Sequence, residues 1–182
     1  MKHHMTLFAF CTGLFSSVAC ADIVGTSSLN ATFTTTIVPG TCTATVKNAE
    51  GIEATDINFG SVFRSELINK SRTQAFSVDL SNCSGVAYAL ITAIPGAGGA
   101  CSTAGSDNFG ASNNVAFEIW QDATDTGTKL SCTTQPKINI KTTAGDSRLS
   151  MNARIVIADA KTINDVTTGP VTAPVTFTVT YQ

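Results

Sequence analysis

The last ten residues of the chain, 173–182, constrain its fold more than any other stretch. Apolar side chains at Val175, Phe177, Val179 and Tyr181 alternate there with threonines. A period of two in β-branched and aromatic residues is typical of a β-strand with one buried and one solvated face. Because no later segment follows to form a hairpin, we expect one edge of this strand to find its partner far away in sequence or in another chain.

Short apolar runs separated by turn-forming residues continue through the rest of the chain, and no window shows a convincing helical period. A polar stretch lies at 64–72 and a Gly/Ser/Ala-rich loop at 95–114. The 86–94 run has no charge, which predicts a central strand buried on both faces. The spacing predicts an all-β fold, an immunoglobulin-like β-sandwich. We expect its strands at 42–46, 57–63, 76–83, 86–94, 115–120, 137–141, 149–157 and 175–181.

The first 21 residues have the pattern of a secretory signal peptide. Lys2 precedes an apolar run, and an Ala-x-Ala site ends at Ala21, which places cleavage before Asp22. The run is too short to span a bilayer comfortably, and no other apolar stretch approaches 18 residues. We therefore expect an exported protein in three parts: a signal peptide at 1–21, an extension at 22–40 and one β-sandwich domain at 41–182.

Charge and histidine content exclude several functions. After cleavage the chain keeps 10 basic and 13 acidic residues, a net charge of −3, which argues against binding nucleic acid or an anionic membrane surface. Both histidines lie in the signal peptide, so Ser-His-Asp and Cys-His catalytic arrangements are excluded. The nearest carboxylate pairs, both in polar, turn-like sequence, are Asp122 with Asp125 and Glu50 with Glu53. We expect solvated charges there, and therefore no catalytic residue and no cofactor.

Four cysteines remain after cleavage, and an even number in an exported chain indicates disulfides. Of the three possible pairings we favour Cys42–Cys83 with Cys101–Cys132, because the first two flank strand-like runs and the last two lie in loop-like sequence. A zinc site is the alternative. Since the spacings contain no short Cys pair and no histidine remains, we expect no metal.

The segment between Asp22 and the Pro39-Gly40 break has a period of two of its own. As a strand, Ile23 to Phe33 would span about 33 Å, comparable with one long strand of a sandwich. Its odd-numbered positions make a weakly apolar face, formed by Ile23, Gly25, Ser27, Leu29, Ala31 and Phe33.

This periodicity suggests assembly by exchange of a strand. We hypothesise that the domain lacks its last strand and that the extension of another copy supplies it, lying in a groove beside residues 175–181. A head-to-tail contact of this kind does not close on itself and therefore builds a filament. In the alternative, residues 22–38 pair within their own chain and give a complete monomeric sandwich.

Several features point in the same direction when they are taken together. They are the signal peptide, the Thr/Ser-rich extension ahead of Cys42, the sequence Phe-Ser-Val-Asp-Leu-Ser-Asn that leads into Cys83, Asn-Ala-Arg at 152–154, Gly169 as the fourteenth residue from the end, and Tyr181 as the penultimate residue. In these features the whole chain resembles the subunits of chaperone–usher pili, the type 1-like fimbrial proteins of Gram-negative bacteria.

The resemblance implies a structural, non-enzymatic subunit of an adhesive pilus, exported through the periplasm to the cell surface. A periplasmic chaperone would first lend a strand to the groove beside the C-terminal strand, and at the outer-membrane usher the extension of the next subunit would replace it. Gly25 would fit a narrow pocket of that groove. The family disulfide would be Cys42–Cys83, and Cys101 and Cys132 are additional to the basic pattern.

Two other functions fit the same sequence. Within the pilus class, the chain would be a minor adaptor or an assembly-terminating subunit. From another class, it would be a secreted carbohydrate-binding β-sandwich, with Trp120 lining the sugar site. We expect Trp120 to lie in the core instead, as the lone tryptophan of a sandwich usually does.

Overall fold

The structure is a computed structural model and describes residues 31–134, 138–142 and 146–182, with the main chain alone for 138–141. The chain divides into two units, Met1–Thr36 and Ile37–Gln182. The second unit contains every described helix and strand. The elements are β1 (Thr41–Asn48), α1 (Arg64–Asn69), β2 (Thr73–Ser84), β3 (Tyr88–Pro95), β4 (Ala100–Cys101), β5 (Phe109–Gly110), β6 (Val115–Gln121), β7 (Thr128–Leu130), β8 (Ile138–Lys141), β9 (Ser147–Ile157), the 3₁₀ helix η1 (Ile163–Asp165) and β10 (Val175–Tyr181).

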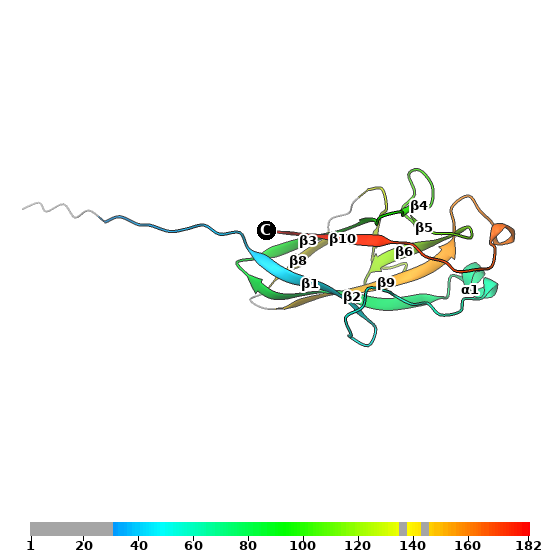
Figure 1. The fold of residues 1–182 in the computed structure, drawn as a ribbon, viewed down its shortest axis with the longest axis horizontal. Helices are drawn as coiled ribbons and strands as arrows, with labels where there is room; N and C mark the ends of the chain where they lie inside the picture. Colours follow the sequence, from blue (N-terminus) through cyan, green and yellow to red (C-terminus); the bar gives the residue numbers. More distant parts are fainter. Residues whose placement is uncertain (1–30, 135–137, 143–145) are drawn as a thin grey trace, which may run out of the picture. The chain divides into compact units, whose positions relative to one another are not determined.

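The strands form two sheets, and the pairings between described strands are antiparallel (Figure 1). The larger sheet has the order β1-β2-β9-β6-β5-β4, and β7 also pairs with β6. The smaller sheet has the order β10-β3-β8. Side chains of both sheets meet in one core cluster, for example Phe76 and Val78 of β2 with Ile91 and Ala93 of β3. The predicted all-β sandwich of immunoglobulin type is confirmed.

Side chains at every second position of a strand point toward this core. On β9, Leu149, Met151 and Ala153 are buried at every second position, because successive side chains of a strand point to opposite faces. The β3 strand is central in its sheet, as expected, but it also alternates between buried and half-buried residues. The prediction that it is buried on both faces is therefore wrong, since a sheet in a two-layer sandwich turns only one face to the core.

The segment at 57–69 differs most from the sequence prediction. No strand forms at 57–63, and the short helix α1 follows in what reads as a polar stretch. The Phe63 N–H donates to Glu66 Oε2 at 2.7 Å, and Leu67 is buried. A helix of six residues is too short to show a helical period in sequence, and its stability comes from tertiary packing. The loop at 95–114 likewise contains the two-residue strands β4 and β5.

Two disulfides join parts of the second unit. Cys42 is bonded to Cys83, with a Cα–Cα distance of 4.1 Å, and links β1 to β2. Cys101 is bonded to Cys132, with a Cα–Cα distance of 5.6 Å, and links β4 to the segment after β7. This is the pairing favoured from the sequence, and each bond stabilises the domain by removing conformational freedom from the unfolded chain.

Candidate functional site

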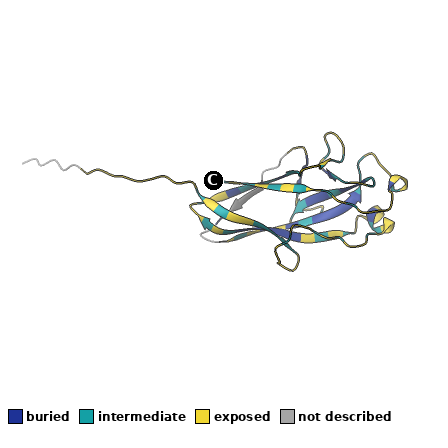
Figure 2. Cartoon of the chain, viewed as in Figure 1, coloured by how far each residue is buried: buried dark blue, intermediate teal, exposed yellow. Residues whose placement is uncertain are grey.

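The C-terminal strand β10 forms an edge of the smaller sheet. Among the described residues it pairs with β3 alone, from Val175 opposite Pro95 to Tyr181 opposite Ala89. Its apolar residues are only half-buried, and Figure 2 shows β10 alternating between intermediate and exposed positions, while dark blue buried positions dominate much of β9. The residues that pack on the core from this edge are Val175, Phe177 and Val179.

Contacts of β10 with the larger sheet show how it is held. The ring of Phe177 packs on that of Phe76 of β2, with centroids 5.8 Å apart. The Tyr181 hydroxyl donates a hydrogen bond of 2.9 Å to the main-chain carbonyl of Cys42, at the start of β1. The C-terminal strand is therefore anchored to both sheets, while its second edge makes no ladder with described residues.

A second segment with unpaired main chain is residues 57–62. Ile57, Phe59 and Val62 are half-buried and pack on the core, while the residues between them are exposed. No main-chain to main-chain hydrogen bond between described residues involves positions 57–62. We call this segment and β10 together the acceptor edge, because both place apolar side chains on the same core cluster and leave main-chain groups without a ladder.

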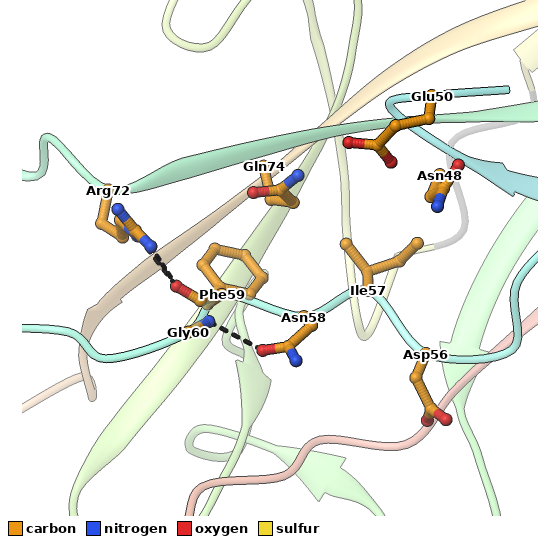
Figure 3. A pocket seen from close by; sticks show the side chains of 9 residues that line it. All are labelled: Asn48, Glu50, Asp56, Ile57, Asn58, Phe59, Gly60, Arg72 and Gln74. Atoms are coloured by element: carbon orange, nitrogen blue, oxygen red, sulfur yellow. Dashed lines mark hydrogen bonds between the residues drawn. The ribbon is translucent and has the colours of Figure 1, made fainter. Parts of the chain in front are cut away.

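Hydrogen bonds with the side chains of Arg72 and Asn58 hold residues 57–62 in place. Arg72 donates to the Phe59 carbonyl through Nε, at 3.0 Å, and through Nη2. The Gly60 N–H donates to Asn58 Oδ1 at 2.7 Å. Figure 3 shows these bonds beside a polar pocket of about 410 Å³, whose lining comprises Asn48, Glu50, Asp56, Ile57, Asn58, Phe59, Gly60, Arg72 and Gln74. The bonds that Figure 3 draws therefore hold residues 57–62 of the acceptor edge in place.

Only two of the six predicted donor positions lie among the residues that the structure describes. Ile23, Gly25, Ser27 and Leu29 lie outside the described residues, as does the predicted cleavage site at Ala21 and Asp22. Ala31 and Phe33 are described and exposed, Phe33 to 95 %. Ile37, at the start of the second unit, is 93 % exposed.

A buried ionic network lies on the outer face of the larger sheet and was missed in the sequence analysis. Arg154 of β9 donates to Glu118 of β6 at 2.6 and 2.8 Å and to Asp125 at 2.6 and 2.7 Å. Lys129 of β7 is 3.2 Å from Glu118. The Arg154 and Glu118 side chains are almost fully buried, whereas that of Asp125 is exposed. The signal for it is the Asn-Ala-Arg sequence at 152–154, although its partners become visible only through the β6–β9 register.

These contacts shift the pKa values of the groups that make them. Burial by itself would raise the pKa of Glu118, but hydrogen bonds from Arg154 and the charge of Lys129 outweigh it and lower that pKa. Hydrogen bonds from Arg154 lower the pKa of Asp125, and those carboxylates in turn raise the pKa of Arg154. Both carboxylates are therefore ionised and act as ion-pair partners of Arg154. A catalytic acid would instead have a raised pKa.

Trp120 lies outside both core clusters, so the expectation that it belongs to the core is wrong. It directly follows the core residue Ile119 in β6, so its side chain lies on the opposite, outer face of the strand, where it is half-buried. Lys129 Nζ and Arg154 Cζ lie 5.7 and 5.9 Å from its ring centroid. Cations at this distance are attracted to the face of an aromatic ring. The indole is thus part of the ionic network.

Other sites considered from the sequence are not assembled in the described part of the chain. No group of three or more His, Cys, Asp or Glu side chains there could hold a metal ion. Asp125 of the Asp122/Asp125 pair binds Arg154. No helix in the same described part has the length and apolar character needed to span a membrane.

Comparison with known proteins agrees with this architecture. The family model described as fimbrial protein matches residues 31–182. The fimbrial-like protein YadL of Escherichia coli strain K12 is 34 % identical over 195 aligned positions, which cover 93 % of this chain and 96 % of YadL.

Solved pilus structures share the fold at low identity. The crystal structure of the P pilus rod subunit PapA matches with a TM-score of 0.59 and 17 % identity, over 78 % of this chain and 99 % of PapA. A structure of a chaperone–usher pilus, determined to explain rod uncoiling, matches with a TM-score of 0.57 and 17 % identity, over 89 % of this chain and all of the matched chain.

Proposed function

Because the chain belongs to the fimbrial protein family and shares its fold with pilus subunits, we propose that it is a structural subunit of a chaperone–usher pilus and that it polymerises by donor-strand exchange. The extension at 22–40, which a signal peptide at 1–21 precedes, is the donor strand. The acceptor edge of the domain at 41–182 receives the extension of a neighbouring subunit.

One observation carries this proposal: the core is bordered by two segments that contribute apolar side chains and that each leave main-chain groups without a ladder among the described residues. Strand β10 has one free edge, and residues 57–62 make no ladder in the described structure. A strand entering between them would supply hydrogen bonds to both and would cover half-buried residues such as Phe59 and Phe177. Unpaired edges with apolar side chains otherwise lead to uncontrolled association.

The extension has the properties of the missing strand. From Ile23 to Phe33 its odd-numbered side chains form a weakly apolar face and alternate with mostly polar ones, which matches an acceptor with one apolar side. Burying Ile23, Leu29 and Phe33 would contribute about 5–9 kcal/mol before ordering costs. The hydrogen bonds of a full strand would add to this contribution.

The same edge explains a need for assembly factors. Until a neighbour arrives, a periplasmic chaperone covers the acceptor edge with a strand of its own. The outer-membrane usher then brings the next subunit, whose extension replaces the chaperone strand. The finished product is a surface pilus, consistent with the structural role of the fimbrial family.

Two variants of the full chain, each co-expressed with a periplasmic chaperone, test donor and acceptor separately. Deletion of residues 22–36 should leave chaperone capture intact and stop donation to a neighbour. Phe177→Asp should abolish chaperone capture, because it places a charge on the apolar face of β10. Thr178→Asp is the matched control, since residue 178 is on the exposed face. Polymers formed by the deletion variant, or normal chaperone capture of Phe177→Asp, would refute the proposal.

A further inference from the structure

The domain has two distinct ends. At one end, which we call the Cys42 end, β1 begins and β10 finishes: Thr41 pairs with Ser84, and Tyr181 contacts Cys42. The other, the α1 end, holds α1 and η1, which contact each other, and the start of β2. In Figure 1 the label C marks the first end and the label α1 the second.

The direction of an accepted strand follows from these ends, if the proposed function holds. The extension leaves its own domain at the Cys42 end, because β1 starts directly after Gly40. An accepted strand parallel to β10 would finish at that same end and would bring the donating domain to the place where the acceptor's own extension leaves. A strand antiparallel to β10 finishes at the α1 end, so that each domain donates at one end and accepts at the other, as an open filament requires.

The α1 end carries exposed apolar side chains. Phe63, which directly follows the 57–62 segment, is 69 % exposed, and Ile68 of α1 is 58 % exposed.

Two more exposed apolar side chains lie where the extension joins β1. Ile37 and Val38 are 93 % and 73 % exposed. These four are a majority of the large apolar residues that are exposed in the described part of the chain; the others are Phe33, Ile52 and Tyr88.

The short length of chain between the donor strand and β1 would place Ile37 and Val38 of the donating copy near the α1 end of the accepting copy. If Phe33 is the last donor residue at the acceptor edge, Ile37 follows four residues later, which is at most about 14 Å of extended chain. We infer that the α1 end is a second contact surface between copies, where Phe63 and Ile68 of the accepting copy pack against Ile37 and Val38 of the donating copy. The partner is a second copy of this chain, and the surface continues the acceptor edge.

Cysteine cross-linking of assembled polymers tests the inference. The variant Val38→Cys/Ile68→Cys should give a ladder of disulfide-linked oligomers, because residues 38 and 68 of neighbouring copies meet. The control Val38→Cys/Tyr88→Cys places the second thiol near the Cys42 end, where Ala89 pairs with Tyr181, and should give none. Polymers that cross-link only through residue 88, or through neither, would overturn the inference. A complete failure to polymerise would remove the proposed function and this inference with it.

A second measurement separates the α1 end from the donor strand itself. In Phe63→Ser/Ile68→Ser, dissociation of neighbouring copies should be about tenfold faster, as expected when a modest apolar contact is lost. A synthetic donor peptide that ends at Phe33 should bind this variant and the native chain equally. Ile52→Ser is the control, because Ile52 is 65 % exposed but lies in the turn after β1. Unchanged dissociation of the double variant would contradict the inference.

Discussion

The Tyr181 hydroxyl donates a hydrogen bond of 2.9 Å to the main-chain carbonyl of Cys42. This bond joins residues 139 positions apart and connects β10, an edge strand of the smaller sheet, to β1, an edge strand of the larger sheet. The disulfide of Cys42 then ties the same point to β2. One end of the acceptor edge is thereby closed, while the second edge of β10 and the 57–62 segment make no ladder with described residues.

Tyr181→Phe tests this closure. The substitution removes one partly buried hydrogen bond and keeps the ring, so we expect the free energy of unfolding to fall by about 1 kcal/mol. Urea unfolding of the domain complemented with a donor peptide of residues 22–38 would measure it. Tyr88→Phe, at an exposed position in the neighbouring strand, should change the midpoint far less. Equal effects of the two substitutions would contradict a role for the Tyr181 hydroxyl.

The ionic network around Arg154 should respond unequally to loss of its two carboxylates. Glu118→Ala leaves a buried guanidinium without its buried partner, so we expect a loss of about 3 kcal/mol in the free energy of unfolding. Asp125→Ala removes an exposed carboxylate and should cost less than about 1 kcal/mol. The comparison uses the same peptide-complemented domain. A larger effect of Asp125→Ala would contradict the expectation that the buried pair contributes more to stability than the exposed one.

The lowered pKa of Asp79 predicts that the folded domain loses stability in acid. Burial by itself would raise its pKa, but hydrogen bonds from Arg148, Ser77 and Lys47 prevail and lower the pKa from 3.8 to about 2. The folded state therefore binds this proton less readily than the unfolded state does, and the contribution of Asp79 is complete above pH 4 and is lost as pH falls toward 2.

Urea midpoints between pH 2 and 6 would test the role of Asp79. The native chain should lose stability below pH 4 more steeply than Asp79→Asn, which should already be less stable at pH 6. Glu53→Gln, at an exposed position, serves as control and should follow the native curve. Parallel curves for the native chain and Asp79→Asn would show that Asp79 does not cause the acid sensitivity.

Gly40 packs directly against the main chain of Gly85 at the root of the extension. A Cβ added at Gly40 would lie 2.8 Å from Val86 Cγ2 and still closer to the Gly85 carbonyl, so the backbone would have to shift. We expect Gly40→Ala to lower the free energy of unfolding by about 1–3 kcal/mol and to slow donation to a neighbour. Thr41→Ala, which adds no atoms at an exposed position, is the control. Normal stability of Gly40→Ala would show that the contact can relax.

Patterns that are local in sequence were sufficient to predict much of this protein. The alternation in 175–181 and 149–157 predicts strands with one buried face, because side-chain direction has a period of two along any strand. Gly/Ser/Thr-rich context separates Cys101 and Cys132 from Cys42 and Cys83. The same alternation suggests a donor strand at 23–33, a prediction that the described residues leave to experiment.

Contacts between distant residues were decided only by the tertiary structure. Arg154 meets Glu118 because the β6–β9 register places them opposite each other, and no local pattern encodes a register between strands 36 residues apart. Ile57 and Phe59 alternate with polar or small residues as in a strand, yet residues 57–62 form no ladder in the described chain. Side-chain periodicity depends on neighbouring residues alone, whereas a strand exists only when another segment pairs with its main chain.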